Sequence, residues 1–375
     1  MPTLPDKVEL QIGGKTHSDW SSYEIDSDLL VPADGFHLTL GASHALPPEI
    51  VPGAPVIVAI GGDTVLTGRI DEIEHSVSKG SHNITVAGRD KAASLLDCSV
   101  PLFTSKTVSL SQIATKILAP FGIGAPKIDA DETTIRDKIN VEPGDTAWDA
   151  LARAAEANGL WPWFEPDGTL VIGGPDYSAP EVATLAMRKD GSGNNLISLS
   201  KHESIHGRYS ELTVLGQTHG TGVNHGRNNL AGGAGDTGVT WYRPKIVIDH
   251  ECVSNALCQA RAGKLLADGR LNGITLTAVV KGHRIVAPGQ PSDGQLWKPG
   301  QRIHVKSEPH GIDGTFFLIG RKFTRSRMDG TRTVLTLKED GVWVLDAHPH
   351  KNRHRRGKNA LPGQIIDIPV PGSQA

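Results

Sequence analysis

One stretch of this chain occurs twice, and the repetition constrains the fold more than any other feature of the sequence. Residues 52–90 and 299–340 both begin with Pro-Gly, continue through three strand-like segments and end in charged residues. The matched positions between those ends are Thr64 with Thr315, Gly68-Arg69 with Gly320-Arg321, Lys79-Gly80 with Asp329-Gly330, and residues 84–87 with 334–337. Two copies so far apart cannot stack as neighbouring repeats of a solenoid. The sequence therefore predicts two related all-β modules with other material between them.

Composition agrees with short strands and narrows the function classes. The 375 residues suffice for two or three domains, and 43 glycines and 24 prolines with 5% aromatic residues suit tight turns. A formal net charge of −3 argues against sequence-independent binding of nucleic acid. Three cysteines are too few for a disulfide framework and indicate a reducing compartment. No membrane span or signal peptide is visible, so we expect a soluble protein that stays inside the cell unless an assembly carries it out.

The N-terminal part predicts the first of the two β-modules. Alternating apolar residues over 8–12 and 36–40 indicate strands, and Gly13-Gly14 indicates a turn. With the first repeat copy these make five or six strands, enough for a small barrel or sandwich. Residues 91–96 predict a short helix that closes the module. We therefore expect a first β-barrel domain over residues 1–104.

The character of the chain changes near Ser109, and residues 105–178 predict a small inserted α+β domain. Ser109 and Gln112 fit a capping box at the start of a helix that Pro120 stops. The other elements expected here are a strand over 135–141, a second helix after Pro143-Gly144 capped by Asp145 or Thr146, and a hairpin around 166–168.

A second β-barrel domain is expected over residues 179–345. Its predicted elements are strands over 196–200, 209–215, 245–248 and 273–280, a helix over 253–269, and the second repeat copy. Residues 216–238 are rich in Gly, Asn and His, which predicts a loop that is mobile or ordered only by a partner. Residues 346–375 form a basic, Pro-containing tail, which is either a solvated terminus or an arm that orders against a neighbouring subunit. The fold class is therefore mainly β, with two related barrels and an α+β insertion.

One motif imitates a catalytic site. His202-Glu203-Ser204-Ile205-His206 is a literal H-E-x-x-H, which binds zinc only when both histidines share one face of a helix. Here the motif lies between two strand patterns, where positions i and i+4 are about 13 Å apart. No third ligand follows at a useful spacing, so the motif predicts no zinc site.

Other candidate residues have simpler structural explanations. Cys252 and Cys258 have no second pair to complete a zinc site and are expected to be small buried residues. Glu142 and Asp145 fit a strand end and a helix cap better than a glycosidase pair. The tail histidines that could bind metal adventitiously are His348, His350 and His354. No P-loop, G-x-S-x-G elbow or dinucleotide fingerprint is present, so we assign no catalytic, cofactor-binding or metal residue.

Residues 143–151, including Trp148, resemble the first helix of a LysM module, which binds peptidoglycan. A LysM module requires a second helix, and a hairpin pattern follows here instead. A tryptophan seated in a small core is therefore the favoured interpretation, and glycan binding stays as its alternative.

The ordered set of motifs resembles one family, the baseplate hub proteins of Mu-like contractile-tailed phages, which are related to the late control D proteins and the T-even phage hub. The residues that carry the resemblance are 84–91 (ITVAGRDK), 95–98 (LLDC), 110–114 (LSQIA), 119–122 (APFG), 208–211 (RYSE) with Thr213-Val214 and Gly216, 242–244 (YRP) and 293–297 (DGQLW). They keep their order over about residues 8–340, whereas the glycine-rich stretch and the tail are not covered.

The resemblance implies a structural protein, not an enzyme, that binds no cofactor. It implies a homotrimer whose six barrel domains form a ring around a channel and join a sixfold tail tube to a threefold spike. The expected partners are the other two copies, the central spike protein, the tail tube or a tube-initiating protein, and other baseplate proteins, with DNA only in transit. The expected location is the virion tail after assembly in the host cytoplasm. The alternatives are a peptidoglycan-binding or cell-wall-degrading tail protein and a metalloprotease.

Overall fold

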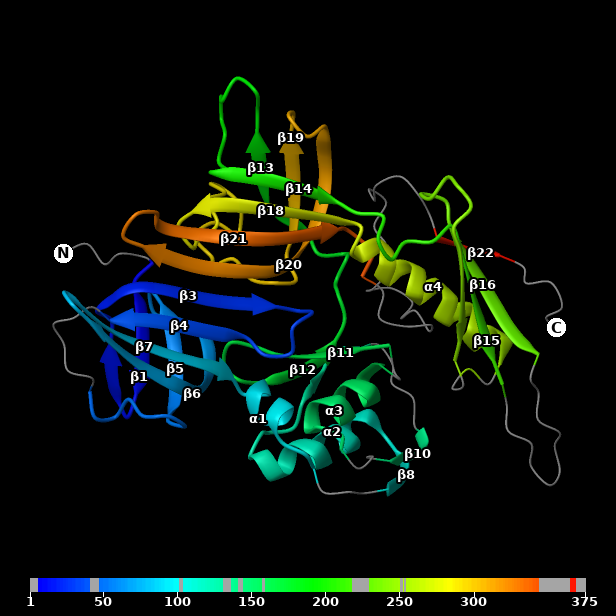
Figure 1. The fold of residues 1–375 in the computed structure, drawn as a ribbon, viewed down its shortest axis with the longest axis horizontal. Helices are drawn as coiled ribbons and strands as arrows, with labels where there is room; N and C mark the ends of the chain where they lie inside the picture. The colour runs from blue at the N-terminus through cyan, green and yellow to red at the C-terminus, as the bar shows by residue number, and fades with distance from the viewer. Residues whose placement is uncertain are drawn as a thin grey trace.

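The computed structural model describes residues 6–40, 47–100, 104–130, 136–140, 144–156, 159–217, 229–249, 252, 254–343 and 365–368. The chain is mainly β, as expected, and most of its strands belong to one sheet with the order β14-β18-β21-β20-β3-β4-β7-β6-β5-β1-β2, to which β19 and β13 add beside β20. This sheet contains both copies of the repeat, and β3 and β4 lie between them (Figure 1).

The first β-module occupies residues 6–90. Its strands are β1 (Val8–Ile12), β2 (Lys15–His17), β3 (Trp20–Asp28), β4 (Gly35–Leu40), β5 (Pro55–Ile60), β6 (Asp63–Ser78) and β7 (Ser81–Asp90). Gly13 and Gly14 have φ of 57° and 77° and make the turn between β1 and β2, as predicted. The pairing order is β3-β4-β7-β6-β5-β1.

The second β-module has the same pairing order. Its strands are β13 (Glu181–Met187), β14 (Ser198–Glu203), β18 (Ile274–Lys281), β19 (Arg302–Ser307), β20 (Ile312–Ser326) and β21 (Gly330–Glu339). They pair as β14-β18-β21-β20-β19-β13, so that each strand corresponds to one in the first module and follows in the same sequence order. One difference is that β13 runs parallel to β19, whereas β1 runs antiparallel to β5.

The two Pro-Gly turns make equivalent backbone hydrogen bonds, which fixes the correspondence between the copies. The Gly53 amide donates to the Ile70 carbonyl at 2.7 Å, and the Gly300 amide donates to the Leu318 carbonyl at 2.8 Å. Both glycines have positive φ, 83° and 92°, which a residue with a Cβ rarely adopts. A β-bulge follows at the same place in each copy, after Ile70 in β6 and after Leu318 in β20. The predicted duplication is therefore confirmed as two related modules.

The strand registers correct the residue matches made from sequence. Ile70 corresponds to Leu318, so Gly68 corresponds to Phe316 and Thr315 corresponds to Thr67, not to Thr64. The Gly-Arg match was wrong because the two dipeptides lie on opposite sides of the bulge: Gly68-Arg69 precedes Ile70, whereas Gly320-Arg321 follows Leu318. The match of residues 84–87 with 334–337 was wrong by one position, because residues 85–88 occupy that place. The charged ends correspond as expected, Arg89 to Lys338 and Asp90 to Glu339.

A small α+β unit lies between the modules. Its elements are α1 (Ala92–Asp97), β8 (Thr104–Val108), α2 (Leu110–Leu118), the 3-10 helix η1 (Ala119–Phe121), β9 (Lys127–Ile128), β10 (Arg136–Asn140), α3 (Ala147–Glu156), β11 (Trp161–Phe164) and β12 (Leu170–Gly173). Both hydrogen bonds of the capping box expected between Ser109 and Gln112 are present. Leu95 of α1 packs in the core of this unit together with α2 and α3. We therefore propose a boundary after Asp90 instead of residue 104.

Residues 204–273 form a separate unit inserted between β14 and β18. Strands β15 (Glu211–Gly216), β16 (Leu230–Asp236) and β17 (Pro244–Ile248) pack on α4 (Asn255–Leu271), with their own core. Figure 1 shows this unit set apart from both modules. The expected second barrel domain over 179–345 is therefore interrupted by a sheet-and-helix unit.

The glycine-rich stretch is in part a buried strand. Residues 230–236 form β16, whose residues are all buried, which corrects the expectation of a loop over 216–238; residues 218–228 lie outside the described residues. A Cβ on Gly232 would meet the Gln259 amide nitrogen of α4 at 2.0 Å. Glycine is therefore required here because the helix backbone approaches the strand closely, not for mobility.

Part of the C-terminal tail returns to the same chain. Residues 365–368 form β22 (Ile365–Ile368), which pairs antiparallel with β16. The rest of the tail, including His348, His350 and His354, lies outside the described residues. This segment is ordered against its own subunit, whereas sequence predicted either a solvated terminus or contact with a neighbour.

Candidate interaction surfaces

The two modules are joined by a ladder between β20 and β3. The first half of β20 pairs with β19, and its second half, residues 320–325, pairs with residues 23–28 of β3. Lys322 and Glu24 form an ion pair across this ladder. We call this contact the seam, and it makes one continuous sheet from the two modules.

Arg321 lies buried at the seam, close to a group of acidic side chains. Its Nη1 donates to the Ile25 carbonyl at 3.0 Å, and its guanidinium carbon is 4.1 Å from the centre of the Phe323 ring. Burial lowers the pKa of Arg321 to about 10, and the charges of Asp34 and Asp26 oppose that change. Burial also raises the pKa of Asp34 to about 6, with the Arg321 charge opposing. The seam therefore holds one cation against carboxylates that resist ionisation.

A second cluster of polar side chains lies on the buried side of the seam. The Tyr23 hydroxyl and His283 Nε2 are 2.9 Å apart, and His283 Nδ1 lies 3.1 Å from the Thr333 hydroxyl. Burial lowers the pKa of His283 to about 3. The ring of His283 also lies 4.6 Å from that of Phe323, centre to centre. A neutral histidine therefore bridges β3 and β21 within the shared core.

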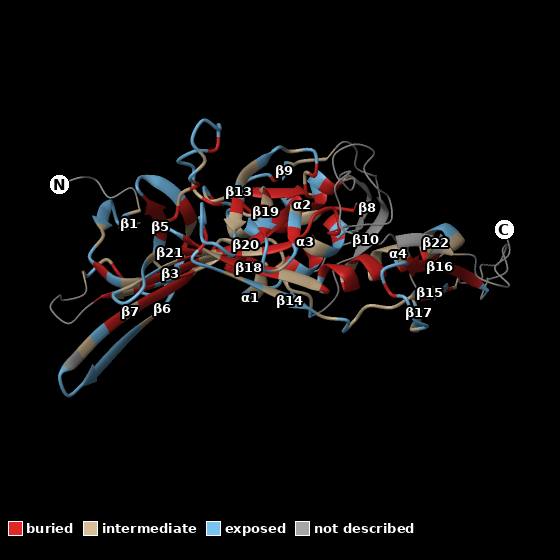
Figure 2. Ribbon diagram, turned by 90° about the horizontal axis from the view of Figure 1, so that it is seen from above, coloured by how far each residue is buried: buried red, intermediate tan, exposed pale blue. Residues whose placement is uncertain are grey.

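Two strand edges that correspond to the sides of the seam have no strand beside them. Strand β5 pairs with β6 only as far as Arg69. Beyond it, over residues 71–78, no strand among the described residues pairs with that edge of β6. In the part of the chain that the structure describes, β14 likewise pairs with β18 alone. Because β6 corresponds to β20 and β14 to β3, these are the same two edges that meet in the seam. Figure 2 shows the β6–β7 hairpin projecting from the body of the molecule.

Side chains that are buried in the seam have more exposed counterparts on the two uncovered edges, as expected for edges without a neighbouring strand. Phe323 is fully buried in the seam, whereas His75, its counterpart in β6, is exposed. Val77 is 74% exposed, which is unusual for a β-branched residue in a strand. Ile25 of β3 is fully buried, and its counterpart in β14 is the half-buried Lys201.

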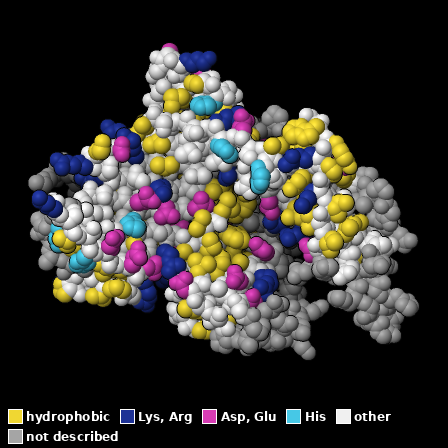
Figure 3. All heavy atoms as spheres, viewed as in Figure 1, with side chains coloured by type: hydrophobic (Ala, Val, Ile, Leu, Met, Phe, Trp, Pro, Cys, Tyr) yellow, Lys and Arg dark blue, Asp and Glu magenta, His cyan; other side chains and the backbone are white. Residues whose placement is uncertain are grey.

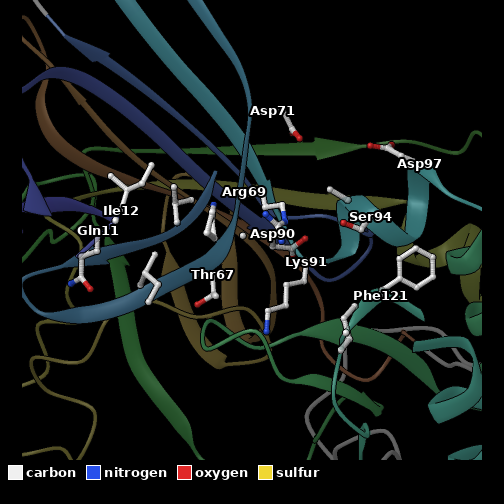
Figure 4. A pocket seen from close by; sticks show the side chains of 18 of the residues that line it. Gln11, Ile12, Thr67, Arg69, Asp71, Asp90, Lys91, Ser94, Asp97 and Phe121 are labelled. Atoms are coloured by element: carbon white, nitrogen blue, oxygen red, sulfur yellow. The ribbon is translucent and has the colours of Figure 1, made fainter. Parts of the chain in front are cut away.

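A cleft of about 680 Å³ lies where the first module meets the α+β unit. Figure 4 shows Arg69, Asp90 and Lys91 near its centre and Phe121 at its far side. The Lys91 ammonium donates to the Gly168 carbonyl at 3.1 Å, which holds the β11–β12 turn against the module. Burial raises the pKa of Asp90 well above its ordinary value, and the charge of Asp34 adds to the rise. The Asp90 carboxylate accepts from the Ala92 amide at 2.9 Å, so this buried acid holds the start of α1.

An exposed apolar face lies on the inserted unit. Ile246 and Ile248 of β17 are 65% and 67% exposed, and Tyr242 in the preceding loop is 79% exposed. Figure 3 shows hydrophobic side chains gathered over this unit. Contiguous exposed apolar side chains of this kind are typical of protein interaction surfaces.

The H-E-x-x-H residues are not arranged as in a metalloprotease. His202 and Glu203 end β14, and His206 lies in the turn beyond it, so no helix aligns the two histidines. Glu203 forms an ion pair with Lys201 at 2.8 Å. Among the described residues, no three His, Cys, Asp or Glu side chains form a group that could hold a metal ion.

The remaining candidate residues have structural roles. Trp148 is 3% exposed and packs in the core of the α+β unit, so it offers no glycan-binding surface. Thr146 caps α3 by accepting from the Asp149 amide at 3.1 Å, and Asp145 pairs with Arg153. Cys252 and Cys258 are buried as expected, and Glu142 lies outside the described residues. No helix among the described residues has the length and apolar character needed to cross a membrane.

The sequence patterns did not predict β3, which is one side of the seam, or β13. β3 alternates imperfectly, with Ser, Glu and Asp on its outer face, and residues 181–187 of β13 carry no strong period. A register built from the Pro-Gly turns, in place of the Gly-Arg dipeptides, would have come within one residue of 72–77, the true counterpart of the joined edge.

Four family models match successive parts of the chain. Residues 7–90 match the N-terminal domain of proteins like the Mu phage baseplate assembly protein GpP, and residues 92–174 match the second domain of proteins like the baseplate hub protein gp44. Residues 208–266 match the third domain of NMB1110-like tail proteins, and residues 268–342 match a tail protein C-terminal domain. These limits coincide closely with the first module, the α+β unit, the inserted unit and the C-terminal part of the second module.

Whole-length relatives agree with the domain matches. The baseplate hub protein gp44 of Escherichia phage Mu is 28% identical over 367 residues, which cover 93% of this chain and 92% of that protein. The crystal structure of the tail protein from Neisseria meningitidis MC58 is 42% identical with a TM-score of 0.80, over 92% of this chain and 99% of that one. A 43 kDa tail protein of prophage MuSo2 from Shewanella oneidensis shares the fold at 24% identity with a TM-score of 0.77, over 88% of this chain and 98% of that one.

Proposed function

The chain belongs to the family of Mu-like phage baseplate hub proteins, and from that membership we propose that three copies form a ring at the centre of the tail baseplate. Each copy contributes two modules, so three copies present six related β-units around the ring axis. A ring of this kind joins the sixfold tail tube to the threefold central spike.

One observation carries this proposal, namely that two modules of one strand order are fused edge to edge in a single chain. The seam between β20 and β3 puts neighbouring modules in one continuous sheet. If the same relation repeats from copy to copy, a closed ring of alternating first and second modules results. The formal net charge of −3 suits a central channel that DNA crosses without binding.

The proposed partners follow from the position in the ring. One face of the ring contacts the tail tube or a tube-initiating protein, the other contacts the spike, and its periphery contacts other baseplate proteins. We propose a structural role without catalysis or cofactor, because the H-E-x-x-H residues lie on a strand end and a turn. Assembly takes place in the host cytoplasm before the protein is carried in the virion tail. The buried Trp148 favours this role over that of a peptidoglycan-binding tail protein.

The test is the mass of the purified protein, alone and mixed with its candidate spike protein. Light scattering at high protein concentration is expected to give the mass of three chains, and negative-stain images are expected to show rings. Addition of the spike protein is expected to give one larger complex with three copies of each. A monodisperse monomer that binds neither spike nor tube protein would contradict the proposal.

A further inference from the structure

The seam within each chain predicts which strands form the contact between neighbouring chains. Its two sides are the second half of β20 and the outer edge of β3. The counterparts of those sides are the second half of β6 and the outer edge of β14, and both are unpaired among the described residues. A strand edge with unpaired amide and carbonyl groups is a template for pairing with another chain.

We propose that the edge of β6 over residues 72–77 pairs antiparallel with the edge of β14 over residues 199–204 in the next copy. This inference rests on the proposed ring, and it adds which edges meet and in which register. The contact is head to tail, because each copy offers β6 to one neighbour and β14 to the other. Three such contacts alternate with the three seams and close the ring.

The register follows from the seam by substituting equivalent residues. In the seam, Thr324 lies opposite Glu24, and Arg325 lies opposite Tyr23. The strand registers make Ser76 the counterpart of Thr324 and Ser200 the counterpart of Glu24. The resulting pairs are Glu72 with Ser204, Ile73 with Glu203, Glu74 with His202, His75 with Lys201, Ser76 with Ser200, and Val77 with Leu199.

The side chains of this register suit a pairing between two chains. Val77, 74% exposed in one copy, is placed against the half-buried Leu199, which already packs at the edge of the core. Glu74 is placed opposite His202, and His75 opposite Lys201 beside Glu203, so the junction brings together both signs of charge. The pairing also accounts for the projecting β6–β7 hairpin, because no strand among the described residues pairs with the outer edge of its β6 half (Figure 2).

Cysteine cross-linking tests the register. Opposed residues of an antiparallel pair have Cα atoms about 4.5–5.5 Å apart, within the range that a disulfide spans. Ser76→Cys and Ser200→Cys are combined in one chain that also carries Cys98→Ser, because Cys98 is an exposed free thiol. On oxidation, denaturing gels without reductant are expected to show linked dimers and a covalent trimer, which reductant returns to single chains.

Control variants test whether the cross-link depends on the proposed register. Glu24→Cys with Thr324→Cys occupies the equivalent positions of the seam and is expected to form its disulfide within one chain, without increase in mass. Val77→Cys with Ser200→Cys places the thiols on opposite faces and is expected to remain unlinked. A mixture of chains that carry Ser76→Cys alone with chains that carry Ser200→Cys alone is expected to stop at linked dimers, because each chain has one engineered thiol. Neither single variant is expected to link by itself, because the contact is head to tail.

The outcomes separate this inference from the proposed function. A trimer by light scattering that gives no cross-link, with melting temperature equal to that of the parent, overturns the strand pairing and leaves the ring intact. A monomer at every concentration overturns both. If the serine variants do not fold, Glu74→Cys with His202→Cys tests the next pair on the same face, and the absence of linked trimers from that folded variant overturns the register.

Discussion

The two β-modules share one strand order but have different neighbours in the molecule. These neighbours explain which equivalent residues differ between the two modules. In the first module β3 turns into β4 over residues 29–34, whereas in the second the whole inserted unit, residues 204–273, stands between β14 and β18. The outer half of β20 is paired in the seam, where Arg321 and Phe323 are buried, whereas the outer half of β6 is mostly exposed. A duplicated module therefore keeps its hydrogen-bond register while each copy adapts its side chains to its own neighbours.

The buried acids at the ends of β7 and β21 show this most clearly. Asp90 and its counterpart Glu339 are both nearly inaccessible to solvent, at 6% and 2% exposed. Glu339 accepts two hydrogen bonds from Arg270 of α4, a residue that exists only because of the insertion. Asp90 instead accepts a hydrogen bond from the Ala92 amide, and burial raises its pKa. One copy balances its buried acid with a charge, and the other disfavours its ionisation.

Removal of that cation is expected to have the largest effect. Arg270→Met leaves Glu339 buried without its guanidinium partner, which typically costs about 3–5 kcal/mol of unfolding free energy. Denaturant unfolding monitored by tryptophan fluorescence measures the loss. Replacing both partners, Arg270→Met with Glu339→Leu, is expected to recover most of it. A single variant as stable as the parent would show that the contact between Arg270 and Glu339 does not stabilise the fold.

A glycine that only the first module requires is expected to give the next largest effect. Gly88 occupies the place of Leu337, and a Cβ there would lie 2.1 Å from the Arg69 carbonyl oxygen and 2.7 Å from the Phe36 ring. Gly88→Ala is therefore expected to destabilise the chain by about 1–3 kcal/mol through forced shifts of well-packed atoms.

The control for this prediction comes from the other module. Gly314 in β20 has the place of Leu66 in β6, and a Cβ on Gly314 would meet nothing within 4 Å. Gly314→Ala is expected to leave the unfolding free energy, measured by denaturant, unchanged within about 0.5 kcal/mol. Equal losses in the two variants would show that the close contacts of Gly88 are not the cause of the destabilisation.

The acids near Arg321 make stability depend on pH in a defined direction. The pKa of Asp34 is raised to about 6 from its ordinary value of 3.8, so the folded state favours the protonated form. The unfolding free energy is therefore expected to fall as pH rises from about 4 through 6 and to level off above. A shift of this size corresponds to about 3 kcal/mol, and partial exposure of Asp34 reduces the expected change to about 1–2 kcal/mol.

Asp34→Asn imitates the protonated acid and tests that direction. The amide oxygen keeps the hydrogen bond that Asp34 accepts from the Asp28 amide at 3.3 Å. The variant is expected to be more stable than the parent at pH 7 by about 1–2 kcal/mol and equal to it at pH 4, with a flatter pH profile. Greater loss of stability at pH 7 than at pH 4 would show that the Asp34 charge is needed by Arg321.

The sequence predicted the modules well and their junctions poorly, for a physical reason. Local signals were sufficient for the capping box at Ser109, the Gly13-Gly14 turn and the helix with a cap at Thr146, because each depends on a few neighbouring residues. The seam depends on β3 and β20, which lie far apart in the chain and carry polar residues on their outer face. Gly232 was misread as a sign of mobility, because the helix that requires it lies more than twenty residues downstream.

The smallest expected effect concerns the charges that face each other in the seam and in the junction between copies. In the seam, Lys322 pairs with Glu24. At the proposed contact between copies, Glu74 takes the place of Lys322, and Ser200 takes the place of Glu24. The acid therefore lies on the strand that carries the lysine in the seam, and position 200 supplies no ion-pair partner for it. Ser200→Lys would supply that partner with the polarity reversed. Exposed ion pairs contribute about 0.2–1 kcal/mol, so each of the three junctions is expected to tighten by that amount.

The trimer dissociation constant, measured by sedimentation at low and high salt, checks this prediction. Ser200→Lys is expected to lower the constant at low salt and to lose its advantage at high salt, because surface charges are screened there. Ser200→Glu, which places a second acid beside Glu74, is expected to raise the constant by a similar factor. Both substitutions lie on an exposed strand position and leave the seam untouched, so neither is expected to change the stability of the single chain. If Ser200→Lys and Ser200→Glu change the dissociation constant in the same direction, β14 does not face β6 in the trimer, and the contact between copies does not repeat the seam.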